Sequence, residues 1–232
     1  MRTDTIDPVR VGGVDPMRPV RHAALKLVAV AAALFVLLCG IGWLLSRPFY
    51  AASQFGHSDL TADSRLAKAR TPWLEHVTYW ITQVAQTRTV IVLALLAVIA
   101  LFLVARRWQQ PLFVAATLFG EVVIFLLVTL VVKRHRPTVP ELDPAPPTSS
   151  YPSGHTAAAV AMYGALAVVV WRTHWERVLR VAVVVLLFLV PLAVAFSRVY
   201  RGMHFPTDVL AGGLLGGLWL TATTALLWPV RR

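Results

Sequence analysis

The sequence is poor in charge, in acidic side chains and in cysteine, and each shortage excludes a class of protein. Only 14% of the 232 residues are charged and 57% are hydrophobic, whereas roughly a quarter of the residues in soluble domains are charged. A sizeable soluble domain is therefore excluded, and a protein that crosses a membrane several times is expected. The single cysteine, Cys39, lies inside an apolar run and has no intramolecular disulfide partner.

Basic side chains outnumber acidic ones, with 22 Lys and Arg against 11 Asp and Glu and a formal net charge of +11. Such an excess can indicate binding to nucleic acid. Here the basic residues stand in clusters between apolar runs, where Lys and Arg set the topology of membrane proteins. The sequence therefore indicates that the basic residues face the lipid bilayer, and no nucleic-acid partner is expected.

The apolar runs predict an all-α integral membrane bundle of six transmembrane helices. The expected spans are about 23–45, 89–105, 111–132, 156–171, 181–196 and 209–228. Residues 1–22 are polar and predict a disordered cytoplasmic tail, which leaves 23–232 as one membrane domain. The first span is too long for the apolar core of a signal peptide, so it is expected to be retained.

The longest segment between spans, residues 46–88, carries too many charges to cross the membrane. Its apolar residues recur at helical spacing and include Trp73 and Trp80. This pattern predicts an amphipathic helix, lying either at the level of the lipid headgroups or packed on the bundle as a covering helix.

Six spans place both termini on one side of the membrane, together with the basic pairs and loops at 106–107 and 172–180. By the positive-inside rule this side is the cytoplasm. The opposite side is also basic, but half of its Lys and Arg residues lie in three polar stretches for which a functional role is expected. The predicted protein is thus a multi-pass protein of the cell membrane with cytoplasmic termini.

The three polar stretches are Lys133–Arg136, Pro152–His155 and Ser197–Asp208. The alternation of the spans brings all three to the face opposite the termini. Ionisable residues at the edge of a membrane are functional candidates by default. This extracytoplasmic face is therefore the expected position of the site.

The third stretch contains a histidine and a carboxylate four residues apart, His204 and Asp208. At a helix entrance the carboxylate can hold one ring nitrogen and leave the other free as a nucleophile. His155, at the end of the second stretch, can protonate a leaving oxygen as a general acid.

Other side chains in these stretches suit an anion. The guanidinium group of Arg198 fits a phosphate with two parallel hydrogen bonds. Ser153 and Gly154 precede a helix whose first amides point at an anion, and Gly154 permits close approach of the backbone. No zinc or two-metal constellation is visible, because the paired acids of such a site are missing.

The order Arg136-Pro137, then Pro152–His155, then Ser197-Arg198-x5-His204-x3-Asp208 resembles the three-part signature of the type-2 phosphatidic acid phosphatase superfamily. That superfamily includes lipid phosphate phosphatases, undecaprenyl-pyrophosphate phosphatases and vanadium-dependent haloperoxidases. The resemblance covers residues from about 125 to 210, and three motifs in order are far more specific than one.

The resemblance implies a membrane phosphatase that needs no metal or cofactor and hydrolyses a lipid phosphomonoester or pyrophosphate. It implies that His204 attacks phosphorus to form a phosphohistidine, that Asp208 orients it, and that His155 protonates the leaving group. The residues implied to hold the phosphoryl oxygens, through electrostatic stabilisation, are Arg136, Ser153, Gly154 and Arg198.

One position departs from the family pattern. The first motif usually has a lysine seven residues before the arginine, where this chain has Thr129. Lys133 lies four residues later, one helical turn along the same face. We therefore predict that Lys133 reaches the same phosphate; alternatively, Lys133 and Arg134 only anchor the span in the headgroups.

Three rival functions stay open at this point. A vanadate-dependent haloperoxidase would use the same pocket, but such family members are soluble and six spans argue against it. A lipid phosphotransferase would pass the phosphoryl group to an acceptor other than water. A non-catalytic lipid-binding or transport protein would not need the set of two histidines, an arginine and an aspartate.

Overall fold

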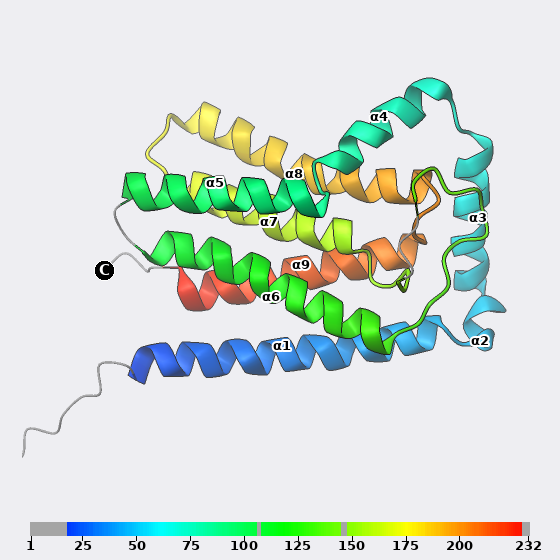
Figure 1. The fold of residues 1–232 in the computed structure, drawn as a ribbon, viewed down its shortest axis with the longest axis horizontal. Helices are drawn as coiled ribbons and strands as arrows, with labels where there is room; N and C mark the ends of the chain where they lie inside the picture. The colour runs from blue at the N-terminus through cyan, green and yellow to red at the C-terminus, as the bar shows by residue number, and fades with distance from the viewer. Residues whose placement is uncertain (1–17, 106–107, 145–147, 229–232) are drawn as a thin grey trace, which may run out of the picture.

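The computed structural model describes residues 18–105, 108–144 and 148–228, and its regular structure there is helical throughout (Figure 1). This confirms the all-α prediction. Most of the predicted tail, residues 1–17, lies outside the described residues, whereas residues 18–22 begin the first helix. The helices are α1 (Arg18–Leu45), α2 (Pro48–Ala51), α3 (Gln54–Lys68), α4 (Pro72–Gln83), α5 (Thr87–Ala105), α6 (Gln109–Val131), α7 (Gly154–Trp171), α8 (Arg177–Tyr200) and α9 (Pro206–Leu227).

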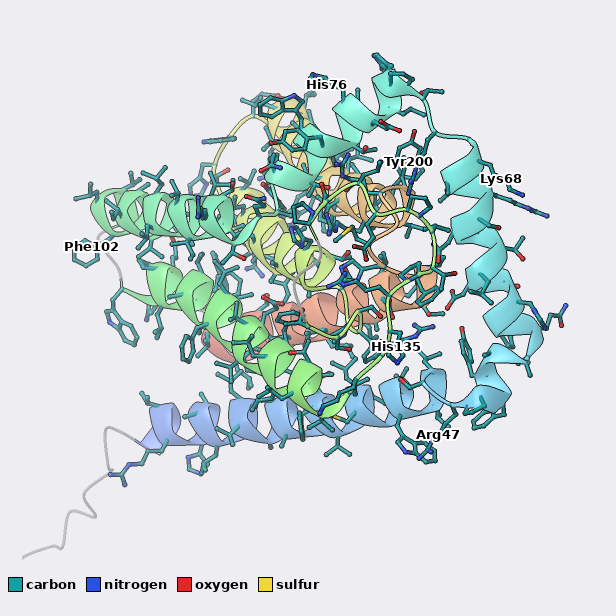
Figure 2. All side chains as sticks on the ribbon, turned by 45° about the vertical axis from the view of Figure 1, so that its right-hand side comes forward. Arg47, Lys68, His76, Phe102, His135 and Tyr200 are labelled. Carbon is teal, nitrogen blue, oxygen red and sulfur yellow. The ribbon has the colours of Figure 1, made fainter. Side chains whose placement is uncertain are left out.

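Six of these helices, α1 and α5 to α9, are long and apolar enough to cross a membrane, as predicted. Large apolar side chains are exposed along α1, α5, α6 and α8, and Phe102 of α5 points away from the other helices (Figure 2). Such wide apolar exposure suits hydrocarbon surroundings and not water. The span α8 extends four residues beyond the predicted limit of 196, so Arg198 belongs to its last turn.

The helix α7 packs against α5, α6, α8 and α9. Small side chains make this packing possible: Ala157, Ala161 and Ala165 are fully buried. On the α9 side, a Cβ added to Gly216 would lie 2.6 Å from the carbonyl oxygen of Ala157. Only glycine permits this approach, which is the close packing expected of small residues in membrane helices.

The segment between the first two spans folds into α2, α3 and α4. The helix α3 lies crosswise over one end of the bundle, and α9 ends at the other (Figure 1). The helix α4 packs on α8, where the buried hydroxyl of Thr82 pairs with that of Ser197 at 2.9 Å. Its tryptophans Trp73 and Trp80 are exposed. The helix α4 therefore packs on the bundle as a covering helix, and its position at the level of the lipid headgroups stays a prediction.

Candidate active site

A cavity of about 930 Å³ is lined by residues of α4 to α8 and of the loops before α7 and α9. Its polar end is lined by Arg136 and Asp143 from the loop between α6 and α7, His155 from the first turn of α7, Arg198 from the last turn of α8, and His204 from the loop before α9. The three polar stretches of the sequence thus contribute side chains to one cavity. From there the cavity continues between α5 and α6, where its lining is mostly apolar.

His204 is buried and held by the backbone. Its Nδ1 lies 2.6 Å from the carbonyl oxygen of Ser150. A carbonyl oxygen only accepts hydrogen bonds, so Nδ1 carries the proton and Nε2 presents its lone pair. Burial, reinforced by the charges of Arg198 and Arg136, lowers the pKa of His204 well below its ordinary value. A neutral ring with a free Nε2 is the form required of a nucleophile.

Asp208 does not make the direct contact with His204 that the spacing suggested. Its Oδ2 is 4.0 Å from Nδ1 of the ring, beyond hydrogen-bond distance. Oδ2 instead accepts from the backbone N–H of Phe205 at 3.0 Å, which caps the start of α9. The carbonyl of Ser150 therefore sets the tautomer of His204, and a backbone group of this kind carries no signature in the sequence.

Arg134 is the partner of Asp208. Its guanidinium group donates to Asp208 at 2.5 Å and to Asp59 of α3 at 3.0 Å. Asp59 also accepts from the hydroxyl of Thr207. The sequence suggested only headgroup anchoring for Arg134, because its acidic partners lie about 75 residues away in either direction. This buried network fastens α3 to the beginning of α9, beside the candidate nucleophile.

Two guanidinium groups in the cavity have unused donors. The Nη1 of Arg136 donates to the carbonyl oxygen of Met203 at 2.7 Å, and that of Arg198 donates to Asp143 at 2.9 Å. The Nε of each arginine is buried without a hydrogen-bond partner among the described residues. A buried unsatisfied donor costs about 1–3 kcal/mol. A phosphate in the cavity would supply the missing acceptors.

Asp143 holds Arg198 from the side of the loop, a role that the sequence did not reveal. Its carboxylate receives two hydrogen bonds from the buried Arg201, at 2.7 and 2.9 Å, in addition to the one from Arg198. Burial raises the pKa of Asp143, but the hydrogen bonds and charges of Arg201 and Arg198 outweigh it and hold this pKa below its ordinary value. The carboxylate stays ionised and keeps Arg198 in place.

Only some of the residues at the start of α7 line the cavity. Gly154 and His155 line it. Ser153 is fully buried outside the lining, with its hydroxyl paired to that of Thr156 at 3.0 Å. Gly154 is closely covered by α6, since a Cβ there would lie 2.7 Å from the ring of Phe125. The structure therefore brings Gly154 and His155 to the site, while the hydroxyl of Ser153 is engaged elsewhere.

Lys133 is exposed and does not line the cavity, whereas Thr129 does. The expectation that Lys133 continues the helical face of Thr129 is wrong, because α6 ends at Val131 and Val132 is extended. In an extended segment successive side chains point to opposite sides, so Val132 and Arg134 are buried while Lys133 is exposed. Contact between Lys133 and a phosphate stays a prediction. His135, labelled in Figure 2, is likewise exposed.

The fold is that of an integral membrane protein, and arginine and histidine side chains line one end of a cavity in its helical bundle. The chain belongs to the PAP2 superfamily, whose family model matches residues 110–232. The resemblance inferred from the three motifs is thereby confirmed, over a longer stretch than the motifs themselves cover.

Two similar proteins of this family are named for different lipid phosphates. An undecaprenyl-diphosphatase from Sulfolobus acidocaldarius is 36% identical over 109 residues, which are 47% of this chain and 48% of that protein. The chain thus spans about half the length of this relative. Phosphatidylglycerophosphatase B from Bacillus subtilis is 30% identical over 164 residues, which are 67% of this chain and 78% of that protein.

Solved structures share the fold. A transmembrane PAP2-type phosphatidylglycerolphosphate phosphatase from Bacillus subtilis superposes with a TM-score of 0.73, covering 93% of this chain and 98% of that one, at 22% identity. LpxE from Aquifex aeolicus superposes with a TM-score of 0.57, covering 72% of this chain and 93% of that one, at 24% identity.

Proposed function

We propose that this protein hydrolyses the phosphate ester or diphosphate of a lipid through a phosphohistidine on His204. One observation carries the proposal. The ring of His204 is fixed with Nδ1 against a carbonyl oxygen, and it lines the same cavity as two guanidinium groups whose Nε donors lack partners. This combination supports an attack on a phosphoryl group whose oxygens accept hydrogen bonds from these donors.

In the first step Nε2 of His204 attacks phosphorus, and the bond from phosphorus to the lipid or diphosphate oxygen breaks. His155 gives its proton to that leaving oxygen. Arg136, Arg198 and the amides at the start of α7 stabilise the charge on the phosphoryl oxygens. In the second step water attacks the phosphohistidine, His155 takes a proton from this water, and phosphate leaves with His204 restored.

A lipid fits this cavity better than a soluble phosphate ester. The cationic end of the cavity lies where α7 begins and α8 ends, at the edge of the spans, and its apolar part continues between α5 and α6. A phosphate bound at the cationic end would leave an attached tail between these helices. The family relatives named for lipid diphosphates and for a phosphoglycerolipid support this class.

We place the site on the extracytoplasmic side of the cell membrane. The basic loop between α7 and α8 lies at the end away from α3 (Figure 1), and the positive-inside rule assigns that end to the cytoplasm. On the α3 side, Arg134, Arg198 and Arg201 are buried in ion pairs. Because these three arginines are held in ion pairs inside the protein, we do not count them as evidence that the α3 side faces the cytoplasm.

Phosphate release from dioleoyl phosphatidic acid and from a polyprenyl diphosphate, measured on the full chain in detergent with EDTA, tests the chemistry. We expect His204→Ala to lower turnover at least about 10³-fold and His155→Ala about 10²- to 10⁴-fold. His135→Ala is the matched control, since this exposed histidine lies outside the cavity.

A labelled phosphoryl group trapped after an acid-free quench should map to His204. Activity that survives in His204→Ala, or that requires an added metal, would contradict the mechanism. The orientation is tested separately in intact cells, in a Cys39→Ser background. There, a membrane-impermeant thiol reagent should label Lys133→Cys.

A further inference from the structure

Glu121 of α6 is a buried acid without a partner inside the apolar part of the cavity. It is 1% exposed and lines the cavity together with Leu118, Val122, Phe125 and Ala158. Its Oε2 has no hydrogen-bond partner among the described residues, and no ion pair recorded for this part of the chain includes it. The proposed hydrolysis of a phosphate makes no use of this residue.

An acid in this position is costly. A polar group buried without a hydrogen bond destabilises a protein, and ionisable residues within membrane spans are by default functional candidates. A role in holding helices together would require a partner. Thr117, one turn earlier on the same helix, has such a partner, because its hydroxyl pairs with that of Thr223 at 2.8 Å. Glu121 has none, so its partner is expected to come from a ligand.

The depth of Glu121 relative to the cationic end follows from the packing of α6 on α7. Phe125 lies against Gly154, at the start of α7. Glu121 precedes Phe125 by four residues, which is about one turn and ~6 Å along α6, away from the anion site and toward the middle of the membrane. This is the level at which the first groups beyond a bound phosphate are expected.

We propose that Glu121 donates a hydrogen bond to an ester carbonyl of the substrate and thereby selects glycerolipid phosphates over polyprenyl phosphates. This inference rests on the proposed function. The ester carbonyls of a glycerolipid are the first polar groups after the phosphate, a few bonds away, whereas a polyprenyl chain is hydrocarbon at the same level. A carboxyl group in its acid form has one O–H donor for such a carbonyl.

A matched pair of lipids isolates this contact: dioleoyl phosphatidic acid and its di-O-oleyl ether analogue differ only in the two ester carbonyls. Farnesyl phosphate provides the hydrocarbon comparison. Glu121→Gln retains a hydrogen-bond donor, whereas Glu121→Met has a side chain of similar length without a donor. Thr117→Val is the control for loss of a buried polar group outside the cavity.

We expect the full-length protein to favour the ester over the ether lipid about 3- to 10-fold in kcat/KM, the range of one neutral hydrogen bond. Most of this preference should lie in KM. Glu121→Gln should keep the preference for the ester lipid. Glu121→Met should reduce the ester-to-ether ratio to about one and should raise kcat/KM for farnesyl phosphate. Thr117→Val should leave the ratio unchanged, whatever its effect on overall activity.

Stability provides a second readout. Because Glu121 has no partner, Glu121→Met should raise the unfolding midpoint or leave it unchanged, whereas a residue kept for structure would lower it. Equal ester-to-ether ratios in wild type and Glu121→Met, or a lower midpoint without a change in ratio, would overturn the inference.

The inference and the proposed function can fail independently. Binding of the same three lipids to His204→Ala, measured by native mass spectrometry, reports the tail preference without hydrolysis. An ester preference that Glu121→Met abolishes supports the role of Glu121 even if no lipid is hydrolysed, and hydrolysis without such a preference in binding or turnover refutes this role alone.

Discussion

Arg134 neutralises two buried carboxylates, so removing its charge is expected to destabilise the protein strongly. Asp208 is fully buried and Asp59 is 4% exposed, and Arg134 donates to both. In Arg134→Met the side chain keeps its length but leaves both acids without a counter-charge. Removing one partner of a buried ion pair costs about 3–5 kcal/mol.

In a chain of this size each kcal/mol shifts the unfolding midpoint by about 2–4 °C. The midpoint of Arg134→Met should therefore fall by about 6–20 °C. Adding Asp59→Asn should recover part of the loss, because one of the two stranded charges is then removed. Activity should fall as well, since the network holds the start of α9 beside His204.

The assay is thermal unfolding in detergent, followed by tryptophan fluorescence. Lys133→Met is the matched control: it removes a cation from the adjacent position, but Lys133 is exposed, and surface changes of this kind stay within about 0.5 kcal/mol. An Arg134→Met midpoint within 2 °C of the control, or no recovery on adding Asp59→Asn, would refute the role of Arg134 as the shared counter-ion.

Three further predictions concern single side chains. Lys133→Ala should leave turnover unchanged because Lys133 is exposed and does not line the cavity; a tenfold rise in KM would instead support the phosphate contact inferred from the motif. Asp143→Asn should raise KM about tenfold or more, the loss of one charge-assisted hydrogen bond to Arg198, and an unchanged KM would contradict its positioning role. Burial, followed by the charge of Asp59, raises the pKa of Asp63 from 3.8 to about 7. The folded protein then binds more protons than the unfolded chain between about pH 4 and 7, so stability falls across this window. Asp63→Asn should unfold at a higher temperature than wild type by a margin that grows from pH 4 to 7, and a constant margin would refute the shift.

The membrane architecture and the meeting of the three polar stretches at one cavity could be predicted from the sequence alone. Apolar runs of sufficient length specify the spans, since a helix in lipid must satisfy its backbone internally. Alternation of the spans then required the three polar stretches to share a face, and the structure has His155, Arg198 and His204 in one cavity. The spans could be predicted because they depend on local composition, and the shared cavity because it depends on the topology of the spans; the catalytic roles of these side chains stay predictions.

The partners of these residues depend on the tertiary structure. Arg134 and Lys133 are adjacent basic residues in the sequence, and only the end of α6 at Val131 and the extended segment after it decide that Arg134 is buried and Lys133 exposed. Asp59 reaches Arg134 because α3 lies across the end of the bundle (Figure 1).

The contacts of His204, Arg198 and Glu121 also could not be predicted from the sequence. A backbone carbonyl holds His204, an acid 55 residues away holds Arg198, and the packing of α6 against α7 sets the depth of Glu121. Each contact joins groups that are distant in the chain or have no side-chain signature. The sequence determines which side chains reach the face of the membrane, and the packing of the helices decides which of them meet.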